Sequence, residues 1–98
     1  MARYDVYRGA VDGYWLDCQA DIFADLNSRF VVPLRPESET PAVTSRLNPV
    51  FVIEGQRYLM KTQFAAAVRR RELGPVITSL DEQGATIMAA LDMLITGY

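Results

Sequence analysis

The sequence predicts a mainly β domain, an antiparallel barrel or sheet that is capped by one C-terminal α-helix. Five or six short stretches suit strands and are separated by turn residues, as is typical of antiparallel β proteins. Residues 79–98 carry apolar side chains at helical spacing. The chain has 98 residues, half of them hydrophobic, so it can bury one core, and we expect residues 1–98 to form a single domain.

The N-terminal segment has the pattern of a β-hairpin. Residues 3–8 alternate between two faces, and the dipeptide Asp12-Gly13 favours a hairpin turn after them. The following segment, residues 14–19, places Leu16 and Cys18 on the same face of a second strand.

Cys18 is the only cysteine, so the chain has no intrachain disulfide and no thiolate metal site of its own. Free cysteine is among the most buried residue types, and the chain has no histidine that would activate a thiol. We therefore expect Cys18 to be a core residue.

The middle of the chain is expected to be mostly irregular. Residues 20–29 suit a loop or short turn, and Phe30 to Leu34 suits a strand that ends at Pro33. Four of the five prolines lie between Pro33 and Pro49, so regular structure of any length is not expected there. A loop this long in a small domain is commonly functional, and a surface crossover between two sheets is the alternative.

A second hairpin follows, with strands at residues 50–53 and 56–60 around Glu54-Gly55. Residues 62–71 contain three alanines and favour one or two helical turns. Gly74 and Pro75 break that segment, and residues 76–80 suit a last strand.

The predicted helix spans Ser79 to Tyr98. Ser79 and Glu82 have capping-box spacing, and Gly97 is a residue type that commonly stops a helix. The apolar stripe consists of Ile87, Met88, Leu91, Leu94 and Ile95. Such a helix either docks on its own sheet or presents its end to a partner.

Composition excludes several classes of function. The net charge of −2 argues against direct binding to bulk nucleic acid, which depends on many Lys and Arg contacts to phosphate. No apolar run is long enough to span a membrane, and the N-terminus does not resemble a secretory signal, so we expect a cytoplasmic protein.

The sequence also lacks the motifs that are typical of catalytic sites and metal sites. Without histidine the usual general base and metal ligand are missing, and no nucleotide-binding or metalloprotease spacing occurs. We expect no catalytic residues, no metal site and no cofactor. The basic cluster Arg69-Arg70-Arg71 either contacts phosphate or an acidic peptide, or is a solvated face beside Glu72.

Several motifs occur in an order and at spacings that resemble the CcdB family of toxins, which act on DNA gyrase, and they cover nearly the whole chain. They are Asp17-Cys18-Gln19-Ala20-Asp21-Ile22, Arg29-Phe30-Val31-Val32-Pro33-Leu34, Leu47-Asn48-Pro49-Val50 with Val52-Ile53, then Arg57, Met60 and Thr62, and the closing helix with Gly97. The resemblance implies an SH3-like antiparallel barrel with a small extra sheet, a C-terminal helix and a two-fold homodimer.

The resemblance also implies a function. Such a toxin is not an enzyme: it inserts into the gyrase A subunit, traps the cleaved complex, and is neutralised by a CcdA-like antitoxin peptide that folds on binding. The target-binding residues that it implies are Ile22, Phe23, Asp92, Ile95, Thr96, Gly97 and Tyr98.

Thr96 departs from the pattern of the best-known member, which has tryptophan there, and whose paired rings clamp an arginine of gyrase. That member also has asparagine at the position of Asp92 and phenylalanine at that of Ile95. Threonine does not make the stacking contact. Two alternatives stay open: an endoribonuclease toxin of the MazF type, which resembles CcdB in fold, and a binding module of CcdB fold that has lost toxicity.

Overall fold

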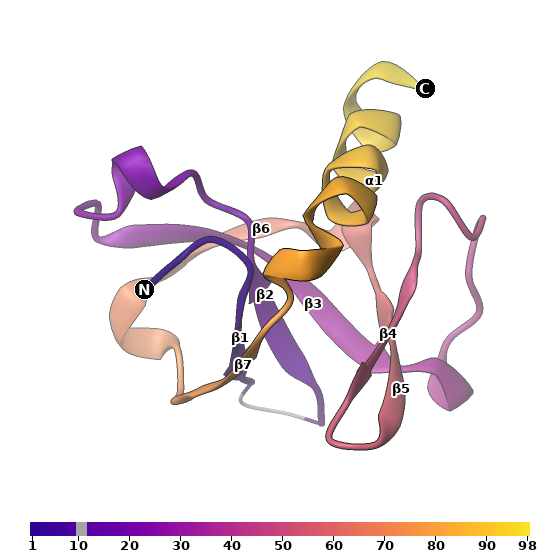
Figure 1. Cartoon of the computed structure of the whole chain (residues 1–98), viewed down its shortest axis with the longest axis horizontal. Coiled ribbons are helices and arrows are strands. Elements are labelled where there is room, and N and C mark those ends of the chain that lie inside the picture. Colours follow the sequence, from indigo (N-terminus) through magenta and orange to yellow (C-terminus); the bar gives the residue numbers. More distant parts are fainter. Residues whose placement is uncertain (10–11) are drawn as a thin grey trace.

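The computed structural model describes residues 1–9 and 12–98, which form one curled antiparallel sheet with a helix at the C-terminal end (Figure 1). The strands are β1 (Asp5–Arg8), β2 (Tyr14–Asp17), β3 (Ser28–Pro36), β4 (Val50–Ile53), β5 (Gln56–Met60), β6 (Ala66–Arg69) and β7 (Val76–Ser79). The helix α1 is Gly84–Thr96, and short 3-10 turns are η1 (Asp21–Phe23), η2 (Glu37–Glu39), η3 (Thr62–Phe64), η4 (Arg70–Glu72) and η5 (Asp81–Gln83). The predicted mainly β fold with a C-terminal helix is confirmed.

β3 is the centre of the sheet. The strand order is β4-β5-β3-β2-β1-β7, and β6 pairs with β3 off this path, within the same seven-stranded sheet. The prediction that this strand ends at Pro33 is wrong. Pairing with β6 stops at Val31 and pairing with β5 starts at Leu34, so Pro33 lies between the two partners. Its carbonyl accepts the Lys61 N–H on that side, and its missing N–H therefore costs no sheet hydrogen bond.

Both predicted hairpins are present. β4 and β5 pair up to Ile53 and Gln56, and Glu54 and Gly55 both have positive φ, 51° and 80°, as a tight two-residue turn requires. β1 and β2 pair up to Arg8 and Tyr14, so their connection is longer than a two-residue turn at Asp12-Gly13.

β6 corrects the prediction of helical turns over residues 62–71. Only the two ends of that segment are helical, as the single 3-10 turns η3 and η4. Ala66 to Arg69 instead pair with Val31 to Ser28 of β3. Alanine favours helix in isolation, but the backbone hydrogen bonds that β3 offers outweigh this weak preference.

The core lies between the curled sheet and the first half of α1. It contains Val6, Tyr14, Leu16, Cys18, Val32, Leu34, Phe51, Ile53, Tyr58, Met60, Leu80, Ile87, Ala90 and Leu91. The prediction that Cys18 is a core residue is confirmed, and burial raises the pKa of its thiol to about 12.

α1 begins later than predicted and docks by only part of its stripe. Ser79 pairs with Asp5 in the sheet, so the helix starts at Gly84, after η5, and the expected capping box does not form. Ile87 and Leu91 are buried, whereas Leu94 and Ile95 are exposed. The second half of α1 therefore extends beyond the sheet (Figure 1).

None of the helices in the described part of the chain is long and apolar enough to cross a membrane.

Candidate functional site

The residues predicted to bind a target lie at two places on the surface. Ile22 and Phe23 belong to η1, and the exposed fractions of their side chains are 84% and 54%. Asp92, Ile95, Thr96, Gly97 and Tyr98 lie at the end of α1, where Ile95 is 76% and Tyr98 79% exposed. Within the chain the two places are well separated, at the upper left and the upper right of Figure 1.

The end of α1 has a defined geometry. The Thr96 hydroxyl donates to the Asp92 carbonyl at 2.7 Å, one helical turn back, and its oxygen accepts the Tyr98 N–H at 3.4 Å. Gly97 has a φ of 84°, and its N–H donates to the Met93 carbonyl at 2.9 Å, which is the predicted αL stop. These contacts set the direction in which the chain leaves the helix.

The apolar surface at this end consists of Leu94, Ile95 and Tyr98, and we call these three residues with Thr96 and Gly97 the C-terminal patch. Leu94 is 43% exposed. The long loop approaches the same end, because the Thr44 hydroxyl contacts the Met93 sulfur at 3.9 Å. Exposed apolar residues grouped in this way are typical of protein interaction sites.

Hydrogen bonds to the N-terminal segment and to β3 stabilise the position of η1. The Gln19 amide donates to the Phe23 carbonyl and accepts the Phe30 N–H, each at 2.8 Å. Asp21 accepts the Arg3 N–H at 2.8 Å. The turn therefore holds Ile22 and Phe23 outward from a fixed base. Gln19 and Asp21 belong to the motif that carried the resemblance, and their role here is structural.

A buried ion pair was not anticipated from the sequence. Neither Asp17 nor Arg29 exposes its side chain, and Arg29 Nε donates to Asp17 Oδ2 at 2.8 Å. Burial raises the pKa of Asp17 above its usual value. The hydrogen bonds that Asp17 accepts from the Gln19 N–H and from Arg29 lower the pKa, but by less than burial raises it. The alternation of residues in β2 predicts that Asp17 lies on the face opposite Leu16 and Cys18, and so gives no sign that Asp17 is buried. Nothing near Asp17 in the sequence identifies Arg29 as its partner.

The long loop between β3 and β4, residues 37–49, is held by Asn48, which is almost fully buried. Its amide nitrogen donates to the Met60 carbonyl at 2.9 Å and to Gln63 at 2.8 Å, and its oxygen accepts the Val43 N–H. The Thr62 hydroxyl donates to the Leu47 carbonyl at 2.5 Å. Asn48 and Thr62 therefore act as anchors of this loop.

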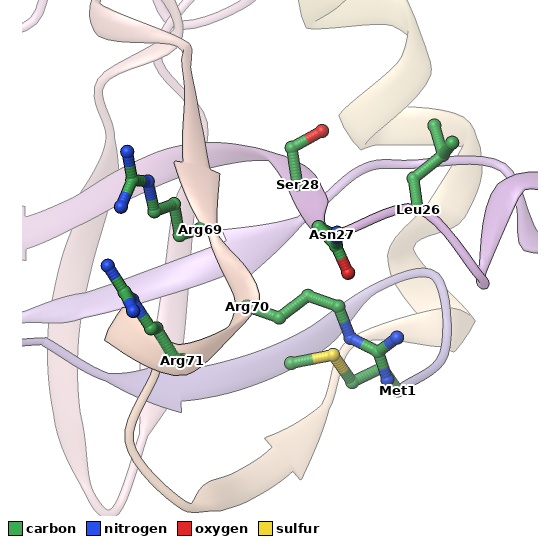
Figure 2. A pocket seen from close by; sticks show the side chains of 7 residues that line it. All are labelled: Met1, Leu26, Asn27, Ser28, Arg69, Arg70 and Arg71. Carbon is green, nitrogen blue, oxygen red and sulfur yellow. The ribbon is translucent and has the colours of Figure 1, made fainter.

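The basic cluster Arg69-Arg70-Arg71 lies at the end of β6 and in η4, and it lines a hollow in the surface. The other lining residues are Met1, Leu26, Asn27 and Ser28 (Figure 2). In Figure 2 the side chains of Arg69 and Arg71 point the same way, and that of Arg70 points toward Met1. Over residues 1–9 and 12–98 no group of three acidic, cysteine or histidine side chains gathers as a metal site would require.

Comparison with known families adds one finding. The chain matches the family described as CcdB protein over residues 3–97. A search of curated protein sequences gives no match. Since the match covers almost the whole chain, and the curled antiparallel sheet with its C-terminal helix agrees with the fold that the resemblance implied, the chain belongs to the CcdB family of toxins.

Proposed function

We propose that this protein inhibits DNA gyrase by binding the gyrase A subunit and trapping the cleaved complex, and that the C-terminal patch makes this contact. The observation that carries the proposal is the exposed end of α1. Ile95 and Tyr98 are more than three quarters exposed on a helix whose first half is buried. A helix that leaves its apolar end in solvent gains stability only when a partner covers that end.

Membership of the CcdB family supports a toxin, which we expect to act as a homodimer in the cytoplasm. In a two-fold dimer the C-terminal patches of both protomers would be available to one target, because symmetric dimers repeat every surface. Ile22 and Phe23 are proposed as a second contact with the same target. A CcdA-like antitoxin peptide is the proposed neutralising partner.

The direct test is a supercoiling reaction with gyrase, ATP and plasmid. A gyrase poison produces linear plasmid after denaturation of the protein, and an endoribonuclease produces none but degrades a defined transcript without gyrase. We expect linear plasmid and an intact transcript. Degradation of the transcript, or the absence of linear plasmid with folded protein, would contradict the proposal.

Two variants connect the reaction to the C-terminal patch. Ile95→Ala should reduce the linear product, whereas Val76→Ala should not, since Val76 is an exposed apolar residue of β7 and lies outside the C-terminal patch. Thr96→Trp should increase gyrase affinity by about 0.5 to 2 kcal/mol, because it restores a ring that stacks on a cation.

A further inference from the structure

The hollow beside η4 is a second candidate binding site, and its chemistry is cationic. It has a volume of about 950 Å³ and lies between the start of β3 and the end of β6. Figure 1 places η4 at the left of the molecule, away from the C-terminal end of α1. A ligand in this hollow would therefore not compete for the C-terminal patch.

Among the residues that the structure describes, no acidic side chain forms an ion pair with Arg69, Arg70 or Arg71. Every ion pair between the side chains that the structure describes involves Arg8, Arg29, Arg35 or Arg57, and none involves the three arginines. The nearest acid in sequence, Glu72, accepts the backbone N–H of Arg69 at 3.3 Å. Three guanidinium groups therefore remain for an external anion, in a protein whose net charge is −2.

The backbone under the cluster is fixed. The Arg70 N–H donates to the Asn27 carbonyl at 2.9 Å, and the Leu73 N–H donates to the Arg70 carbonyl at 3.1 Å. Arg69 also pairs with Ser28 in the sheet. The three side chains thus start from a constrained strand end and turn, Arg69 from β6 and the other two from η4, which lowers the entropy cost of gathering them around a ligand.

The hollow also has an apolar side. Leu26 is half exposed and lines it beside Asn27, on the side away from Arg69 and Arg71 (Figure 2). A nucleic acid would need many phosphate contacts, and the acidic character of the chain opposes them. A peptide needs fewer charges and can add an apolar side chain, so the mixture of guanidinium groups with Leu26 favours a peptide.

From this geometry we infer that the hollow formed by Leu26 and Arg69-Arg70-Arg71 binds a segment of a partner protein that carries several carboxylates and an apolar side chain. The carboxylates pair with the guanidinium groups, and the apolar side chain covers Leu26. This site goes beyond the proposed gyrase contact and does not depend on it.

The probe is a short, fluorescently labelled peptide of glutamates around one leucine, compared with the same peptide made with glutamine. Binding is followed by anisotropy at low and high salt. The triple variant R69Q/R70Q/R71Q is compared with R8Q/R46Q/R57Q, which removes three cations elsewhere and takes the net charge from −2 to the same −5. Circular dichroism establishes that both variants are folded.

We expect the glutamate peptide to bind the native protein and the matched control, and to lose about tenfold or more in affinity with the first triple variant or at high salt. The single variants R69Q and R71Q should each lose about twofold to fivefold. Equal binding by both triple variants, equal binding of the glutamine peptide, absence of binding, or tighter binding of a labelled DNA duplex would overturn the inference.

Discussion

Asp17 and Arg29 form an ion pair on adjacent strands in which neither side chain reaches solvent, with Arg29 Nη2 at 2.6 Å from Asp17 Oδ2. Asp17 Oδ1 also accepts the Gln19 N–H at 3.0 Å. Arg29 Nη1 is buried without a hydrogen-bond partner among the described residues. Two buried charges with this geometry depend on each other, because each alone would be an uncompensated charge in the interior.

Replacing Arg29 by Met should therefore destabilise the fold by about 3 to 5 kcal/mol, since it leaves the Asp17 carboxylate buried alone. Urea unfolding followed by circular dichroism measures this. The matched control is Arg57→Met, which breaks the ion pair of Arg57 with Glu37 at the surface. That change should leave the free energy of unfolding nearly unchanged, because solvent screens an exposed ion pair. Equal losses for the two variants would show that burial of the pair is unimportant.

Asn48→Ala should cost about 1 to 3 kcal/mol, because it leaves the Met60 carbonyl and the Val43 N–H without their partner. The exposed Ser45 belongs to the same loop, and Ser45→Ala should change the free energy of unfolding by less than about 0.5 kcal/mol. If Asn48→Ala is as mild as Ser45→Ala, the loop is not held by this residue.

Cys18 should react slowly with a thiol reagent in the native protein and rapidly in urea. Its pKa is about 12 in the fold and about 8.5 in an unfolded chain. Above about pH 8.5 the unfolded state releases a proton that the folded state keeps, so stability should fall as pH rises toward 12. Cys18→Ala should remove the part of this decrease that begins near pH 8.5. Fast native labelling would refute the assignment of Cys18 to the core.

Local signals in the sequence predicted some elements correctly. Glu54-Gly55 determines its hairpin through two neighbouring residues, and Gly97 ends α1 by its own conformation. β6 was missed because its alanines favour helix locally, while its pairing partner Phe30 is more than thirty positions away. Strand pairing between residues that are so far apart in the chain produces no periodic pattern in the local sequence that would predict it.

In the candidate site, too, the features that depend on local sequence were predicted, and those that depend on distant contacts were not. The apolar stripe of α1 was visible, but its periodicity does not show which part docks, because that depends on how far the sheet extends. Of the stripe, the resemblance assigned only Ile95 to the target, and Leu94 is exposed as well. Arg29 was part of a motif, yet its burial against Asp17 depends on the strand register. The hollow at Arg69-Arg70-Arg71 requires Leu26, which is distant in sequence.

The protein should be a homodimer at micromolar concentration, because membership of the CcdB family favours dimerisation and symmetric dimers are the commonest oligomers. Ile95→Asp and the matched control Val76→Asp should both remain dimeric, because the C-terminal patch is proposed to stay available to the target. Sedimentation equilibrium measures both variants. A native protein that is monomeric at this concentration would remove the dimer and the shared target site.

Deletion of Gly97 and Tyr98 tests the central claim most directly, because one variant reports on both stability and target binding. Tyr98 is 79% exposed, so its loss should lower the free energy of unfolding by less than about 1 kcal/mol. Binding to gyrase A, measured on the same sample, should be abolished. A stability loss of about 3 to 5 kcal/mol, as for a buried ring, would contradict the assignment of Tyr98 to the target site, and so would unchanged gyrase A binding by the folded variant.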